Sequence, residues 1–238
     1  MDLNNQEPIR EAVEYKTSSI EISNSLFSKS FAWMFMGLIA TAIVSIISVM
    51  SGLTIKMAEG GNSFLIVLLI EFAVVLLFSF GFKKFSATAV TVLYCSYAIL
   101  NGITFSIIFY IFELKSIVSI LFITAGIFGG LSLIGKNTER DLTSFGSILS
   151  MFLIGGLIAS LINLFLQNSI LDIIIDWVIL LFFLGVTVYD VHRLKNASLF
   201  EDTQGFGEKL HIYFAMQLYL DFINIFIRIL SIFGKRRN

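Results

Sequence analysis

Long apolar stretches dominate this chain, and short polar stretches separate them. A helix needs about 20 predominantly apolar residues to cross a hydrocarbon core of about 30 Å. The stretches have about that length, and runs such as Phe64 to Phe80 lack the alternating polarity of membrane-barrel strands. We therefore predict an all-α polytopic membrane protein with seven transmembrane helices, at about residues 31–50, 63–82, 86–112, 116–134, 143–166, 170–190 and 208–233.

The polar stretches divide the chain into three parts. Residues 1–28 are predicted to be a polar cytoplasmic tail, 29–234 the seven-helix transmembrane domain and 235–238 a short basic tail. The composition of residues 1–28 favours a solvated, disordered segment, with a binding element for another protein as the alternative. Most connections between the spans are short, so neighbouring helices are expected to be antiparallel.

The composition of the whole chain agrees with a membrane location. It contains 57% hydrophobic and only 14% charged residues, and its mean hydropathy is +0.89. A net charge of −1 provides no basic field for nucleic acid. Cys95 is the single cysteine, which excludes an intramolecular disulfide.

Basic residues predict the orientation of the chain, because they gather on the cytoplasmic side of membrane proteins. If seven spans alternate, ten of the 16 lysine and arginine residues lie on the side of the N-terminus and five on the other side. We therefore predict a cytoplasmic N-terminus in the cell membrane. Three basic residues of the C-terminal tail would lie outside and so disagree with this rule: Lys235, Arg236 and Arg237. An alternative is therefore that the last segment does not fully cross the membrane.

A polar stripe runs along the last predicted span. Gln217, Asp221, Asn224 and Arg228 fall within about 60° of arc on a helix that is otherwise apolar. A charge at membrane depth costs about 2.5 to 3.5 kcal/mol on insertion scales, so such residues usually face the bundle interior and mark a pathway. We expect the function of the protein to involve this stripe.

A second aspartate, Asp190, closes the sixth predicted span. The sixth and seventh spans are antiparallel neighbours, so Asp190 and Asp221 could meet inside the bundle. Their depths differ, because Asp221 is about 20 Å into its segment whereas Asp190 is near the end of its own. A purely structural alternative pairs Asp221 with Arg228, or Asp190 with Lys84. Glu71 is a further intramembrane acid.

Small residues predict where helices approach one another. Gly126 and Gly130 form one pair spaced by four residues, and Gly155 and Ala159 form another. Such pairs permit close helix packing in a membrane.

Several motifs together resemble the Bax inhibitor-1 family in its bacterial branch. They are Tyr189–Asp190, LYLDFIN from Leu218 to Asn224, Glu71, and IGK…RDL from Ile134 to Leu142. The resemblance implies six helices around a central C-terminal helix, and a pH-sensitive calcium leak. It also implies that Asp190 and Asp221 form the aspartate pair of the ion pathway, with a basic latch for the closed state at Lys84 or, second, at Lys83.

The chemistry of an aspartate pair suits that role. Two close carboxylates in a low-dielectric setting share one proton, so protons compete with a divalent cation for their oxygens. We expect the deprotonated pair to accept calcium and favour an open path, and the protonated pair to favour a closed one. Calcium takes six to eight oxygens. Asp190, Asp221 and Asn224 supply fewer, which predicts a transient calcium site and no bound cofactor.

Two other functions compete with the leak. An intramembrane aspartyl protease also uses two aspartates, but no GxGD surrounds Asp221, and the one proline, Pro8, cannot supply that class's PAL motif. We therefore predict that the protein is not an enzyme. The second alternative is a membrane-embedded regulator or binding partner of a membrane protease without transport activity.

Overall fold

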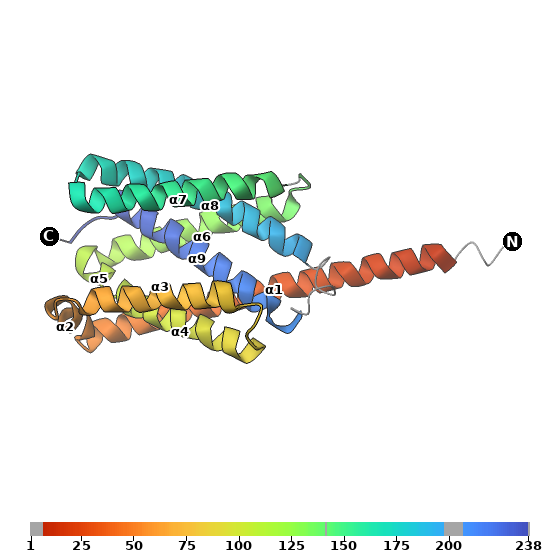
Figure 1. The fold of residues 1–238 in the computed structure, drawn as a ribbon, viewed down its shortest axis with the longest axis horizontal. Coiled ribbons are helices and arrows are strands. Elements are labelled where there is room, and N and C mark those ends of the chain that lie inside the picture. Colours follow the sequence, from red (N-terminus) through yellow and green to blue (C-terminus); the bar gives the residue numbers. More distant parts are fainter. Residues whose placement is uncertain (1–6, 141, 198–206, 238) are drawn as a thin grey trace.

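The computed structural model describes residues 7–140, 142–197 and 207–237, and these residues form a bundle of long helices (Figure 1). The described residues form seven long helices. Helix α1 has 44 residues, and the other six have 19 to 28 residues each. Three short helices connect them. In chain order the helices are α1 Glu7–Met50, α2 Leu53–Glu59, α3 Ser63–Gly81, α4 Ala87–Phe105, α5 Ile108–Ile111, α6 Leu114–Asn137, α7 Thr143–Leu166, α8 Ser169–Asn196, the 3₁₀ helix η4 Gly207–Lys209, and α9 Leu210–Phe233.

The predicted all-helical membrane fold is confirmed. Six segments are long and apolar enough to cross a membrane: Ser23–Met50, Ser63–Gly81, Ala87–Ile111, Leu114–Asn137, Ser169–Asn196 and Leu210–Phe233. The remaining predicted span, 143–166, coincides with α7, which is 24 residues long. The count of seven crossings depends on α7 and stays a prediction.

The last helix lies in the centre of the bundle. In α9, 56% of the apolar window is buried, compared with 11% to 39% in the other five candidate spans. It contacts α1, α4, α6 and α8 and runs obliquely between them in Figure 1. Apolar side chains on several sides of α9 are buried, including Phe214, Ala215 and Met216, which are about 100° apart in turn around the helix. Burial on several sides agrees with the central position of α9.

The first helix begins earlier than expected. We expected residues 1–28 to form a disordered tail, yet α1 is continuous from Glu7, and residues 1–6 lie outside the described residues. Helix propagation costs little once a stable helix is present, so the apolar part of α1 can extend into the polar segment. Packing against the bundle starts near Ser23, whose hydroxyl donates to the carbonyl of Lys195 at 3.0 Å. The N-terminal part of α1 projects beyond the bundle (Figure 1).

The C-terminal tail is fixed at the opposite end of the bundle (Figure 1). The amide of Glu113 donates to the carbonyl of Lys235 at 2.9 Å, and the amide of Arg237 donates to that of Ile111 at 2.8 Å. The Lys235 ammonium also pairs with the Glu113 carboxylate at 2.7 Å. Helix α9 therefore runs the length of the bundle and is long and apolar enough to cross a membrane, while the side on which the C-terminal tail lies stays a prediction.

The close helix approaches occur at glycines other than the predicted ones. A methyl group added at Gly126, Gly130 or Gly155 would meet no atom within 4 Å among the described residues, so the predicted packing role of these glycines is wrong within this chain. Gly155 and Ala159 instead line an apolar hollow of about 510 Å³ between α7 and α8. At Gly102, by contrast, an added methyl group would lie 2.8 Å from the carbonyl oxygen of Thr41 on α1.

Candidate functional site

Asp190 and Asp221 are both buried, on the neighbouring antiparallel helices α8 and α9 that pack against each other. Asp190 is only 5% exposed and Asp221 only 2%. Helix α8 does not end at Asp190 but continues to Asn196, so Asp190 lies inside its helix. Asp221 lies near the middle of the antiparallel α9.

Asp221 has an unsatisfied carboxylate oxygen. Its Oδ2 atom is buried and has no hydrogen-bond partner among the described residues, and the same is true of the Gln217 amide oxygen. The amide nitrogens of the stripe are occupied elsewhere, since Gln217 donates to the Tyr213 hydroxyl at 3.2 Å and Asn224 donates to the Leu220 carbonyl at 2.7 Å. A buried acceptor without a donor is costly, so this oxygen is a place where a proton or a cation would bind favourably.

A basic residue that the sequence analysis missed lies beside the pair. The Arg193 guanidinium is 3.6 Å from the Asp190 carboxylate, one helical turn further along α8. It also lies over the Tyr189 ring, 5.6 Å from the centroid. The spacing of three residues between Asp190 and Arg193 could have revealed this contact, because such residues share one face of a helix.

The two predicted latch residues are not near the aspartates. Lys83 and Lys84 are exposed where α3 meets α4, and neither forms an ion pair with Asp190 or Asp221 in the part of the chain that is described. The structural alternative of an Asp190–Lys84 pair is therefore wrong. The turn between α3 and α4 is bound by Lys209, whose ammonium donates to the carbonyls of Phe82 and Phe85 at 2.8 and 2.7 Å.

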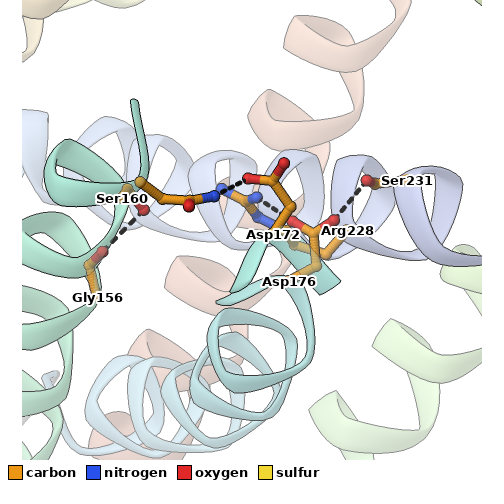
Figure 2. Close-up of polar contacts among 7 residues, drawn as sticks. Gly156, Ser160, Asp172, Asp176, Arg228 and Ser231 are labelled. Carbon is orange, nitrogen blue, oxygen red and sulfur yellow. Dashed lines mark hydrogen bonds and ion pairs between the residues drawn. The ribbon is translucent and has the colours of Figure 1, made fainter. Parts of the chain in front are cut away.

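Arg228 pairs with a different aspartate from the one that we considered. Its guanidinium binds Asp176 on α8, and the Ser231 hydroxyl donates to the other oxygen of the same carboxylate (Figure 2). The alternative of an Asp221–Arg228 pair is wrong, and so is the expectation that Arg228 could neutralise Asp221. Asp176 was missed, although an aspartate inside the sixth apolar segment was visible in the sequence.

Glu71 belongs to another polar layer of the bundle. It is 8% exposed, and its carboxylate accepts a hydrogen bond from the Thr104 hydroxyl at 2.8 Å. In the same layer the Tyr219 hydroxyl donates to the Asn101 amide oxygen at 3.0 Å and is 2.6 Å from the Thr41 hydroxyl. This layer joins α1, α3, α4 and α9, so Glu71 reaches Asp221 only indirectly, through α9.

The described residues contain no group of three or more histidine, cysteine, aspartate or glutamate side chains that could hold a metal ion. Asp190 and Asp221 together offer four carboxylate oxygens. A calcium ion between them would therefore need water or other oxygens to complete its six to eight ligands. The arrangement suits brief binding of a cation better than its storage.

Comparison with known proteins identifies the family. The family described as "Inhibitor of apoptosis-promoting Bax1" matches residues 23–238, a range that begins where α1 starts to pack against the bundle. The chain is 40% identical to Inner membrane protein YbhL of Escherichia coli strain K12 over 210 residues, which are 87% of this chain and 90% of that protein. It is 37% identical to an uncharacterized protein of Borreliella burgdorferi over 222 residues, or 92% and 95% of the two chains.

Both relatives are bacterial, and the first is named for its place in the inner membrane. That location agrees with the helices of this structure that are long and apolar enough to cross a membrane. The extent of the matches, together with the buried aspartates of α8 and α9, leads to one assignment. This chain is a membrane protein of the Bax inhibitor-1 family.

Proposed function

We propose that this protein is a pH-sensitive calcium leak channel of the cell membrane, gated by protonation of Asp190 and Asp221. The observation that carries the proposal is the burial, on packed neighbouring helices, of two carboxylates, one of which has an oxygen without a hydrogen-bond donor among the described residues. Charged groups inside a membrane bundle are costly and usually mark an ion or proton path.

The gate operates through competition between protons and calcium for the same oxygens. Two deprotonated carboxylates repel one another in a low-dielectric environment, and a divalent cation relieves that repulsion. A shared proton relieves it as well, without a cation, and stabilises the buried, closed arrangement. In this scheme Arg193, at 3.6 Å from Asp190, supplies the positive charge that the resemblance assigned to Lys84 or Lys83.

The orientation of the channel follows from the basic residues. With the N-terminus in the cytoplasm, the end of the bundle that carries Lys83, Lys84 and Lys209 faces the cytoplasm. Asp190 then lies nearer to the cytoplasmic side, Asp221 lies near the middle of α9, and the C-terminal tail lies outside. Calcium would enter the cell through the end of the bundle that carries this tail.

Calcium flux in proteoliposomes tests the proposal. Vesicles loaded with a calcium-sensitive dye should take up calcium faster with the wild-type protein than without protein, and the Asp190→Asn/Asp221→Asn variant should lose most of that excess. The exposed acid Glu59 provides the matched control, because the Glu59→Gln variant removes a carboxylate outside the pair. Wild-type vesicles no more permeable than empty ones at any pH would refute the proposal.

A second candidate function is regulation of a membrane protease through a direct contact. The projection of α1 beyond the bundle favours it, because a helix outside the packed core is accessible to another protein (Figure 1). Deletion of residues 2–20 leaves the contact of Ser23 with α8 in place. This deletion should abolish protease binding and preserve calcium flux if the regulator function exists, and unchanged binding to the protease would exclude a role for the projecting helix.

A further inference from the structure

A second charged group lies between α8 and α9, toward the end of the bundle where the C-terminal tail is fixed. Asp176 is two turns into α8, and Arg228 and Ser231 are in the last two turns of α9. Figure 2 shows Arg228 and Ser231 both directed at the Asp176 carboxylate. The three side chains are far along the helices from Asp190, which is about 21 Å from Asp176 at 1.5 Å per residue.

The pair is only partly shielded. The Arg228 side chain is 27% exposed and that of Asp176 is 12% exposed, while Ser231 is exposed near the end of α9. The Arg228 Nε atom is buried and has no hydrogen-bond partner among the described residues, so the guanidinium is held by one edge. An arginine bound in this way can leave its partner more easily than one bound through both edges of its planar fork.

Arg228 also lies on the same face of α9 as the proposed gate. It is seven residues from Asp221, or about 10 Å along the axis, and Asn224 lies between them on the stripe. A cation that moves along this stripe from the tail end toward Asp221 therefore passes the guanidinium first. A fixed positive charge in a low-dielectric setting repels such a cation.

We propose that Asp176 and Arg228 close the cation path at the tail end of the bundle, with Arg228 as the charge barrier and Asp176 as the residue that positions it. This inference rests on the proposed calcium leak and adds a second closure to it. The Asp176 carboxylate offsets part of the Arg228 charge, so the guanidinium blocks the path by its position on the stripe together with the positive charge that remains. Movement of Arg228 off the stripe opens this end.

The two members of the pair then have opposite effects on flux. Arg228→Gln removes the barrier and leaves the Asp176 carboxylate, which attracts calcium, so flux should rise at least about threefold. Asp176→Asn leaves an unpaired guanidinium on the stripe, so flux should fall by a similar factor. A salt bridge with only a structural role would give changes in the same direction for both variants, because either substitution breaks the pair.

The experiment measures calcium uptake by proteoliposomes at about pH 8 for the wild type and both variants, after thermal unfolding in detergent has shown that each is folded. Asp172→Asn is the matched control, since Asp172 is exposed one turn before Asp176 and accepts a hydrogen bond from Asn163 instead of Arg228. It should change flux little. The exchanged variant Asp176→Arg/Arg228→Asp retains the ion pair but puts a carboxylate on the stripe in place of the guanidinium, so its flux should rise as with Arg228→Gln. Flux equal to that of the wild type would refute the barrier, which provides a test if Arg228→Gln does not fold.

The outcomes separate the two proposals. If wild-type vesicles carry no calcium, the leak itself is refuted. If the wild type conducts but Arg228→Gln and Asp176→Asn shift flux in the same direction or not at all, the barrier is refuted and the leak stands. A fall with Asp172→Asn as large as that with Asp176→Asn would also refute it, because the effect would then come from general surface charge. Both single variants should keep their response to pH, since Asp190 and Asp221 are unchanged.

Discussion

Two buried polar residues of α9, two positions apart, are in opposite chemical situations. Tyr219 is fully buried, and its hydroxyl is bonded to both Asn101 and Thr41. Asp221 is buried to nearly the same extent, yet one of its carboxylate oxygens lacks a partner. Satisfied buried groups stabilise a fold, whereas an unsatisfied ionisable group at membrane depth indicates function. We therefore assign the hydrogen-bonded group of Tyr219, Asn101 and Thr41 to stability, and Asp221 remains the residue to which the proposed conduction is ascribed.

Replacement of Tyr219 by phenylalanine tests this division. The change removes one hydroxyl and leaves the amide oxygen of Asn101 without its donor, so the variant should lose about 1 to 3 kcal/mol of stability. Thermal unfolding in detergent measures the effect. Tyr110→Phe is the control, because Tyr110 is 37% exposed and should tolerate the loss of its hydroxyl. Equal unfolding temperatures for the two variants would show that the Tyr219 layer does not stabilise the bundle.

At the scale of helices, close packing depends on glycines that face a neighbouring backbone. Gly102 on α4 meets the Thr41 carbonyl of α1, and Gly135 on α6 meets the Val188 carbonyl of α8, each within 3 Å of where a methyl group would be. Gly126 and Gly130 have the favourable spacing for such contacts but face open space. Spacing along one helix identifies a smooth surface, and it does not reveal which surface a neighbouring helix covers.

A pair of alanine substitutions tests the contact between α1 and α4. Gly102→Ala would place a methyl group 2.8 Å from a backbone oxygen, so the helices must separate and the variant should be less stable by about 1 to 3 kcal/mol. Gly126→Ala adds the same group at a site with free space and should have little effect. Unfolding temperatures of the purified proteins measure both. A Gly102→Ala variant as stable as Gly126→Ala would contradict the described approach of α1 and α4.

For the whole molecule, the apolar pattern was sufficient to predict the class and most of the helices. Hydropathy measures the length of each apolar run, and for this reason six of the predicted spans coincide with helices that are long and apolar enough to cross a membrane. Hydropathy does not show the polar turns by which a helix continues beyond its apolar run. Asp190 was therefore expected to end the sixth span, whereas it lies inside α8. The central position of α9 was predicted from the family resemblance, and the pairing of Asp190 with Asp221, which that resemblance implies, stays a prediction. The partners of Arg228 and Asp190 depend on side-chain directions in the packed bundle, which the sequence leaves open.

The bundle also predicts which side of the membrane each end occupies. Lys84, between α3 and α4, and Arg236, in the C-terminal tail, are both exposed. The turn from α3 to α4 and the C-terminus lie at opposite ends of the bundle (Figure 1). In a Cys95→Ser background, an impermeant maleimide added to intact spheroplasts should label the Arg236→Cys variant and not the Lys84→Cys variant, and both should react after permeabilisation. Labelling of both variants in intact spheroplasts would contradict opposite locations, and labelling of Lys84→Cys alone would reverse the predicted orientation.

The most direct test of the account is the pH dependence of calcium flux in proteoliposomes containing the wild type or Asp221→Asn. Deprotonation favours cation binding by the pair, so wild-type flux should rise between about pH 6 and 8. Asp221→Asn cannot exchange a proton at this position, so its flux should be nearly constant over that range, while Glu59→Gln should follow the wild type. An equal response to pH in the wild type and Asp221→Asn would contradict the claim that this aspartate senses protons.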